Sequence, residues 1–145
     1  GVCSEHTPHS LSEKQGNVWQ VAAGMPNIQE SIPALITGWL KNFGQDSLEE
    51  CLVRLAQVTS YNIAMIFGFK NKGGIALNKD ADLAIIDTKS KWHVKQSDLF
   101  TKNRWSAYEG KRLVGRPIAT FLRGSLVYEN GKVIGEPKGQ HQAKS

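Results

Sequence analysis

The chain contains 145 residues, of which 40% are hydrophobic and 21% are charged, and its formal net charge is +5. This composition is typical of a globular protein with a buried core and excludes a disordered chain. No apolar run reaches the ~20 residues that a membrane helix needs, and the first residues lack the basic and apolar regions of a signal peptide. Two cysteines, Cys3 and Cys51, are too few for a disulfide framework, so we expect a cytoplasmic location.

The first half of the chain predicts loops and then a helix. Residues 1–10 are polar and rich in histidine, and residues 11–27 contain the glycines and proline of a loop. Apolar residues then recur at helical spacing over residues 28–39. Pro33 lies inside this run, so we expect the helix to begin or kink there.

A second helical segment has the clearest pattern. Ser47 and Glu50 are spaced as a capping box, in which each side chain bonds a free backbone N–H at the helix start. An apolar stripe follows on one face, made up of Leu48, Cys51, Leu52, Leu55 and Ala56. We expect a break at residues 59–60 and a further helix over residues 61–67 that ends at Gly68.

The second half of the chain predicts strands. Residues 81–87 form a short apolar run between charged residues, which is typical of a buried strand. Residues 92–94 and 118–128 favour further strands, and the pair Asn130–Gly131 predicts a hairpin turn before a return strand. We therefore expect helices first and strands later.

The basic residues carry little functional information. The excess of 18 basic over 13 acidic residues is mild, and the lysines and arginines are scattered. A nucleic-acid-binding surface gathers such residues with aromatic side chains on one face. We expect neither a nucleic-acid partner nor a membrane partner.

Several short motifs occur in a fixed order along the chain. They are SEHTPH at residues 4–9, EK at 13–14, AGMPNIQ at 23–29, KGGIA at 72–76, KDADLAIID at 79–87 and WSAYEG at 105–110. Together they resemble the carboxyl-terminal third of the cyclic amidohydrolases, the family of dihydroorotases, allantoinases and hydantoinases.

The resemblance implies an α/β fold. Residues 1–70 would be the last strand and following helices of a metal-dependent (β/α)8 amidohydrolase barrel. Residues 71–136 would be the carboxyl-terminal strands of the accompanying β-sandwich domain, and residues 137–145 a polar tail. Barrel enzymes place their chemistry at the carboxyl ends of the strands, which is where the first motif would lie.

The resemblance also implies roles for four residues. Glu5 stands where the family has the aspartate of an Asp-His-x-Pro-His frame. That carboxylate contacts the metal, takes a proton from a metal-bound water and returns it to the leaving amide nitrogen. His9 matches the substrate-carboxylate binder of dihydroorotases, a position where allantoinases usually carry cysteine. Ala23 and Gly24 match the backbone groups offered to the pyrimidine ring.

Glu5 is a departure from the family pattern. Its extra methylene moves the carboxylate by about 1 Å, and a misplacement of that size can cost ~100-fold in rate. Two interpretations remain open. One is a cyclic amide hydrolase, with dihydroorotase favoured by His9 and allantoinase or hydantoinase as alternatives. The other is a non-catalytic pseudo-amidohydrolase that serves as a scaffold.

The family's other metal ligands, an HxH pair, a carboxylated lysine and further histidines, do not occur at matching positions in this sequence. We therefore expect that the partner of this chain is the remainder of the same polypeptide or barrel, with one or two zinc ions in the full-length enzyme. The isolated chain is expected to be inactive. A small cyclic amide is the expected substrate, and a homo-oligomer the expected assembly.

Other residues are interpreted as structural. His6 is assigned to packing, and Cys3 to a strand as a small hydrophobe. Trp105 and Tyr108 are expected to support the crossing between barrel rim and sandwich. Surface or turn positions are expected for the rest: His93, His141, Asp80, Asp82 and Asp87.

Overall fold

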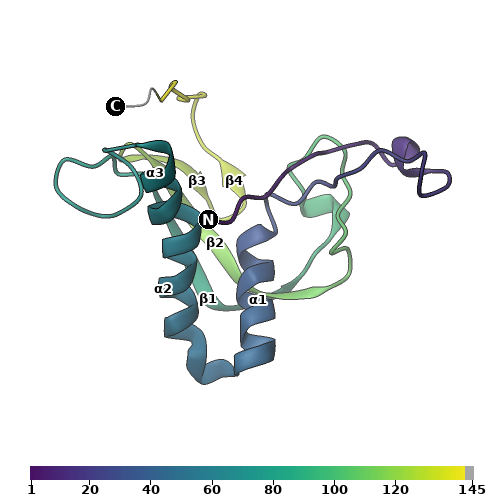
Figure 1. Ribbon diagram of the computed structural model, residues 1–145, viewed down its shortest axis with the longest axis horizontal. Coiled ribbons are helices and arrows are strands. Elements are labelled where there is room, and N and C mark those ends of the chain that lie inside the picture. The colour runs from purple at the N-terminus through teal and green to yellow at the C-terminus, as the bar shows by residue number, and fades with distance from the viewer. Residues whose placement is uncertain (143–145) are drawn as a thin grey trace.

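The computed structural model describes residues 1–142 as a helical region followed by a sheet (Figure 1). The helices are α1 (Ser31–Phe43), α2 (Leu48–Ala56) and α3 (Asn62–Phe67). The strands are β1 (Leu83–His93), β2 (Arg112–Leu122), β3 (Ser125–Glu129) and β4 (Lys132–Val133), and they form an antiparallel sheet in the order β1-β2-β3-β4. The predicted order of helices and strands is confirmed, whereas the boundary between residues 70 and 71 stays a prediction.

Helix α1 positions the rest of the fold by packing on β2. Pro33 lies in its first turn, where a missing N–H is harmless, so the helix starts there rather than kinks. The helix ends at Gly44, whose φ is +86°. On the sheet side, Ile36 is completely buried, and the Val114 N–H donates a hydrogen bond of 2.8 Å to Thr37 Oγ1.

The predicted capping box is wrong. Ser47 is the last residue of a short 3-10 turn, Gln45–Ser47, that runs directly into α2. Its hydroxyl donates backward to the Gly44 carbonyl at 2.7 Å and accepts the indole N–H of Trp39 at 3.0 Å. Because these two partners use the hydroxyl, it makes no side-chain cap at the start of α2.

The predicted break at residues 59–60 is also wrong. A π-helical turn, Gln57–Tyr61, joins α2 to α3 without interruption, and the Thr59 hydroxyl donates to the Leu55 carbonyl at 2.7 Å. Such turns insert one residue into a helix without ending it. The expected end of the helix is confirmed, since Gly68 adopts a left-handed conformation with φ +74°.

The sheet is an antiparallel meander in which tight turns join β2, β3 and β4, whereas a long connection joins β1 to β2. Residues 81–87 and 92–94 contribute to one strand, β1, rather than to two, and its register against β2 shifts between Asp87 and Lys91. Asp87 Oδ1 accepts the backbone N–H groups of Lys89 and Ser90 at this irregularity, at 2.9 and 3.2 Å, which confirms its turn role. The predicted hairpin is also confirmed.

Both β-hairpins use residues with positive φ, as two-residue turns of the primed type require. Asn130 and Gly131 have φ values of +45° and +88° between β3 and β4. Arg123 and Gly124 have φ values of +45° and +76° between β2 and β3.

The other aspartates of this region hold the start of β1. Asp82 Oδ1 accepts the Arg123 N–H at 2.7 Å, and its other oxygen bonds Lys72. Asp80 bonds Lys72 Nζ at 2.7 Å and Asn71 Nδ2 at 2.8 Å. These contacts confirm the interpretation of the aspartates as strand-end and turn groups. His93 and His141 are exposed, as predicted.

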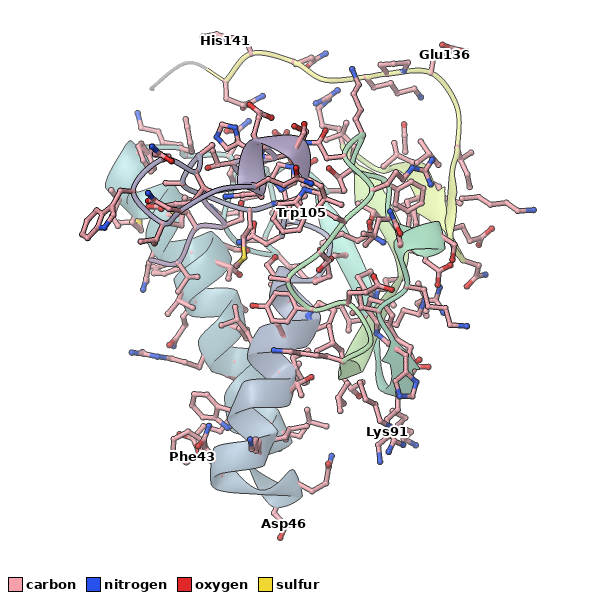
Figure 2. All side chains as sticks on the ribbon, turned by 90° about the vertical axis from the view of Figure 1, so that its right-hand side faces the viewer. Phe43, Asp46, Lys91, Trp105, Glu136 and His141 are labelled. Atoms are coloured by element: carbon pink, nitrogen blue, oxygen red, sulfur yellow. The ribbon has the colours of Figure 1, made fainter. Side chains whose placement is uncertain are left out.

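A small core supports the long connection between β1 and β2. Val94, Leu99 and Leu113 are buried together, with Trp92 and Tyr108 packed against them. A 3-10 turn, Gln96–Asp98, begins this connection. The connection carries Trp105, which Figure 2 shows beneath the amino-terminal segment, far from Phe43 and Asp46 at the tip of the helical hairpin.

Residues 1–10 form no strand in the described part of the chain. Their main-chain bonds to other segments are sparse: the Val2 N–H donates to the Val58 carbonyl at 2.8 Å, and the Thr7 N–H to the Met25 carbonyl at 3.2 Å. A strand needs a neighbouring strand along its whole length. The expected last barrel strand is therefore not formed by these residues, so the placement of Cys3 in a strand is wrong, and its side chain is exposed.

Cys51 is buried, and burial raises the pKa of its thiol.

Over residues 1–142, no helix combines the length and the apolar character that a membrane crossing needs.

Candidate active site

The segment with Glu5 lies beside the loop with Ala23 and Gly24. His6 joins the two, because its Nδ1 accepts the backbone N–H groups of Asn27 at 3.1 Å and Ile28 at 3.2 Å. His6 is therefore a packing residue, as predicted. The structure thus brings together two of the motifs that the sequence singled out.

Glu5 is exposed and its backbone has φ +44°. Positive φ is uncommon outside glycine and costs roughly 1–2 kcal/mol, and such strain clusters at functional sites. The Thr7 hydroxyl fixes this turn by donating to the Glu5 carbonyl at 2.8 Å. Among the described residues no group bonds the Glu5 carboxylate, so it is accessible to a ligand.

Gly24 allows the close approach of the two segments. Its φ is +103°, and a Cβ at this position would lie 2.5 Å from Thr7 Cβ. The glycine is therefore required by contact with Thr7 as well as by its own backbone conformation. Ala23 and Gly24 are both exposed, so their backbone groups are accessible to a ligand.

Gly24→Ala is expected to lower the free energy of unfolding by roughly 1–3 kcal/mol, because the new methyl group overlaps Thr7. Thermal unfolding of a protein with the substitution measures this effect. Gly38→Ala in α1 is the matched control: no atom lies within 4 Å of its would-be Cβ, and we expect it to stabilise by about 0.5–1 kcal/mol. Equal effects of the two substitutions would contradict the close-packing role of Gly24.

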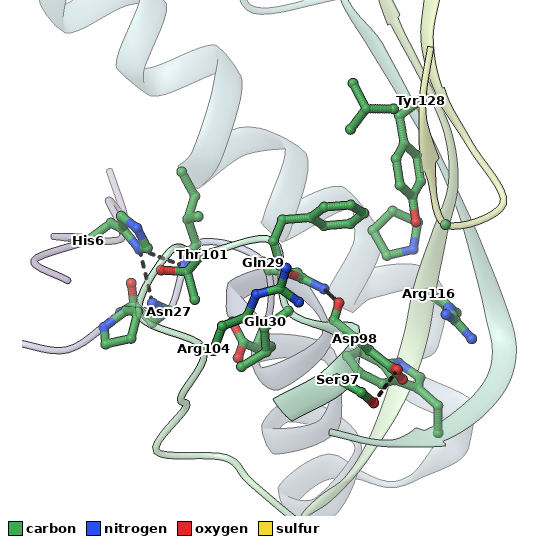
Figure 3. Close-up of a pocket in the computed structure, with 18 of the residues that line it drawn as sticks. His6, Asn27, Gln29, Glu30, Ser97, Asp98, Thr101, Arg104, Arg116 and Tyr128 are labelled. Atoms are coloured by element: carbon green, nitrogen blue, oxygen red, sulfur yellow. Dashed lines mark hydrogen bonds between the residues drawn. The ribbon is translucent and has the colours of Figure 1, made fainter. Parts of the chain in front are cut away.

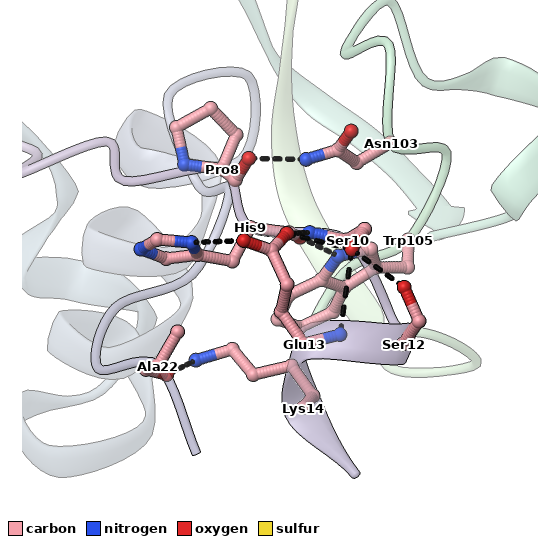
Figure 4. Close-up of polar contacts among 9 residues, drawn as sticks. All are labelled: Pro8, His9, Ser10, Ser12, Glu13, Lys14, Ala22, Asn103 and Trp105. Atoms are coloured by element: carbon pink, nitrogen blue, oxygen red, sulfur yellow. Dashed lines mark hydrogen bonds and ion pairs between the residues drawn. The ribbon is translucent and has the colours of Figure 1, made fainter. Parts of the chain in front are cut away.

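His9 lies in a polar cluster at the other end of the segment (Figure 4). Its Nδ1 is 3.3 Å from Glu13 Oε1. The other carboxylate oxygen, Oε2, accepts the Ser10 hydroxyl at 2.6 Å and the Ser10 N–H at 2.7 Å. These bonds, first that of the Ser10 hydroxyl, lower the pKa of Glu13 to about 2, so the carboxylate is ionised at neutral pH.

The connection between β1 and β2 donates two hydrogen bonds to the backbone of this segment. The indole N–H of Trp105 donates to the His9 carbonyl at 2.7 Å, across 96 positions of sequence. Asn103 Nδ2 donates to the Pro8 carbonyl. The expected structural role of Trp105 is confirmed, whereas sequence reasoning missed Asn103 and gave no role to Glu13, although EK was one of the ordered motifs.

A cavity of about 800 Å³ lies nearby, between the loop before α1, the connection after β1 and the strands β2–β4 (Figure 3). Glu30, which is only 2% exposed, lines it together with Arg104, Arg116 and Tyr128. His6 also lines it, but Glu5, His9, Ala23 and Gly24 do not. We place the candidate site at Glu5 and His9, because the Glu5 carboxylate and the His9 Nε2 atom bond no residue in the described part of the chain.

The described residues do not fit a metal site on their own. No group of three or more histidine, cysteine, aspartate or glutamate side chains converges within residues 1–142. His6 Nδ1 is used by the backbone and His9 Nδ1 by Glu13, so each of these histidines has only Nε2 left for a metal. These two atoms and the Glu5 carboxylate do not converge on one point. A zinc site takes three or four ligands.

Comparison with known proteins identifies related chains. No family model matches the sequence. It is 34% identical over 146 residues to a dihydroorotase of Pyrococcus furiosus, covering 99% of this chain and 32% of the relative. It is 34% identical over 140 residues to an allantoinase of Desulfitobacterium hafniense, covering 97% of this chain and 30% of the relative. The chain thus spans about a third of the length of the curated relatives it matches.

Solved structures agree with the sequence comparison. A D-hydantoinase (dihydropyrimidinase) from a Thermus species is similar with a TM-score of 0.77 and 27% identity, over 90% of this chain and 28% of that one. An L-hydantoinase (dihydropyrimidinase) from Arthrobacter aurescens is similar with a TM-score of 0.73 and 29% identity, over 83% of this chain and 26% of that one. The predicted fold class, an α/β fragment of an amidohydrolase, is confirmed. Over most of its length the chain is similar to one part of the cyclic amidohydrolases, the family of dihydroorotases, allantoinases and hydantoinases.

Proposed function

We propose that this chain acts as one segment of a hydrolase that opens the ring of dihydroorotate, giving N-carbamoyl-aspartate. The observation that carries the proposal is the exposed, unbonded carboxylate of Glu5, held on a fixed turn beside Gly24. The similarity to dihydroorotases supports the substrate class, and His9 favours a substrate with a carboxylate.

The chemistry requires one proton to move twice. Water attacks the amide carbon, and Glu5 takes a proton from that water as the new C–O bond forms. When the C–N bond breaks, Glu5 returns the proton to the ring nitrogen. The water oxygen ends in a new carboxylic acid, which releases the second water proton to solvent as it becomes a carboxylate, and Glu5 is restored to its ionised form.

The proposal assigns substrate binding to the neighbouring groups. In the imidazolium form, the Nε2–H of His9 donates to the carboxylate of dihydroorotate, a charge-assisted bond that is stronger than a neutral one. The backbone of Ala23 and Gly24 bonds the ring. The remaining polypeptide of a cyclic amidohydrolase supplies the other ligands for one or two zinc ions, with Glu5 as the ligand from this chain. We further propose a cytoplasmic homo-oligomer.

A second candidate is a scaffold protein without catalytic activity. It is favoured by Glu5 itself, which is longer than the aspartate of the family frame. In that case the fold and its contacts are retained while ring opening is lost. The two candidates differ in the turnover of cyclic amides.

His9→Ala is expected to lower kcat/KM for dihydroorotate roughly 10- to 100-fold, the value of a hydrogen bond to a charged group. The loss for hydantoin is expected to be less than threefold, since hydantoin has no carboxylate to bind. Steady-state assays of the protein that carries this segment measure both. An equal loss for the two substrates would contradict the proposed role of His9, and no ring opening of any cyclic amide would favour the scaffold.

A further inference from the structure

Contacts with Ser10 hold the Glu13 carboxylate in place next to His9. Its Oε2 accepts two bonds from Ser10, one from the hydroxyl at 2.6 Å and one from the backbone N–H at 2.7 Å. The Ser10 hydroxyl also lies 2.9 Å from Ser12 Oγ. These contacts fix the plane of the carboxylate and leave Oε1 facing the imidazole (Figure 4).

The turn that carries Glu13 is itself anchored to the loop before Gly24. Glu13 and Lys14 lie in a 3-10 turn, Ser12–Lys14. The Glu13 carbonyl accepts the Ala22 N–H at 3.2 Å, and the Lys14 ammonium donates to the Ala22 carbonyl. One short turn therefore connects His9 with the chain directly before Ala23 and Gly24.

The backbone of His9 is fixed independently by Trp105, whose indole N–H bonds the His9 carbonyl at 2.7 Å. The His9 side chain is 33% exposed, so part of the ring is open to solvent. Its Nδ1 contacts Glu13, and its Nε2 bonds no residue in the described part of the chain. The ring is thus held from one side and accessible from the other.

An ionised carboxylate can only accept hydrogen bonds. The Nδ1 atom of His9 must then carry a proton whenever it bonds Glu13, in the neutral ring as well as in the imidazolium. In the imidazolium, Nε2–H is the remaining donor. This is the arrangement by which a carboxylate sets the tautomer and the direction of a functional histidine.

We infer that Glu13 is a positioning residue for His9: it accepts the Nδ1–H and, when the ring is an imidazolium, directs the Nε2–H toward the carboxylate of the substrate. The substrate half of this inference rests on the proposed function of His9. Lys14 completes the arrangement by fixing the loop with Ala23 and Gly24 to the same turn. The EK motif at residues 13–14 thereby gains a role.

The first test is the tautomer of His9, read from the 15N resonances of its ring in the neutral form. We expect the Nδ1–H tautomer in the unsubstituted chain and a shift toward Nε2–H in Glu13→Ala. Glu13→Gln keeps the volume without the charge and is expected to shift the ring in the same direction. Glu109→Ala, at an exposed glutamate, is the matched control and leaves His9 unchanged. The same His9 tautomer with and without Glu13 overturns the inference.

The second test separates binding from chemistry. Glu13→Ala is expected to raise KM for dihydroorotate about tenfold, with little change in kcat and little effect on hydantoin. A changed tautomer with an unchanged KM overturns the substrate role of His9 while retaining its contact with Glu13. An unchanged tautomer overturns the positioning role whether or not the protein is active, so the two failures are distinguishable.

Discussion

Glu5→Ala is expected to lower the turnover of dihydroorotate by roughly 10²- to 10⁴-fold, the range that a general base contributes. The carboxylate is the proposed acceptor of the water proton, and no other described carboxylate occupies the turn beside Gly24. Glu5 is exposed and its side chain bonds no described residue, so we expect the thermal stability to stay unchanged. Steady-state rates and thermal unfolding of the protein that carries this segment measure both effects.

Two further variants sharpen this test. Glu5→Asp introduces the residue of the family frame, and we expect it to retain or increase activity because the shorter side chain matches the frame. Glu49→Ala, at an exposed glutamate of α2, controls for the loss of a negative charge. Turnover of Glu5→Ala within threefold of the unsubstituted protein would show that Glu5 is not the base. Activity that appears only in Glu5→Asp would identify a decayed site.

Ile36→Ala is expected to lower the free energy of unfolding by about 2–5 kcal/mol, the cost of a cavity in a packed core. Ile36 is completely buried and fills the space above Gly115 in β2. A Cβ on that glycine would lie 2.9 Å from Ile36 Cδ1. The side chain thus joins α1 to the sheet.

Leu35→Ala is the control for Ile36, because Leu35 is the next residue of the same helix and is 36% exposed. We expect it to cost less than about 1 kcal/mol, since surface changes have small effects. Urea denaturation of both variants gives the comparison. Similar midpoints for the two would mean that the contact of α1 with β2 is not the main support of the fold.

The parts of the fold that the sequence predicts correctly depend on local signals. Gly68 ends α3 and Asn130–Gly131 turns between β3 and β4 because positive φ is needed at those positions. The capping box predicted at Ser47 is wrong because the Ser47 hydroxyl bonds the Gly44 carbonyl and the Trp39 indole instead, the latter through a tertiary contact. The π-helical turn at residues 57–61 has no comparable sequence signal.

The candidate site, too, is predicted from the sequence only where local motifs define it. Glu5, His9, Ala23 and Gly24 come from an ordered set of motifs, and the structure fixes Glu5 and Gly24 through Thr7. The role of Trp105 at His9 depends on a contact across 96 positions, which no local pattern encodes. The bond between Glu13 and His9 is local, but the sequence does not show that Ser10 bonds the other carboxylate oxygen and so fixes the Glu13 side chain.

The most direct test of Glu5 as the general base is ring opening of dihydroorotate by the purified, zinc-loaded protein that carries this segment, measured as the appearance of N-carbamoyl-aspartate. We expect turnover that exceeds that of the Glu5→Ala variant by at least 10²-fold. Bound metal with no ring opening of dihydroorotate, allantoin or hydantoin would contradict it and would identify a scaffold with the amidohydrolase fold.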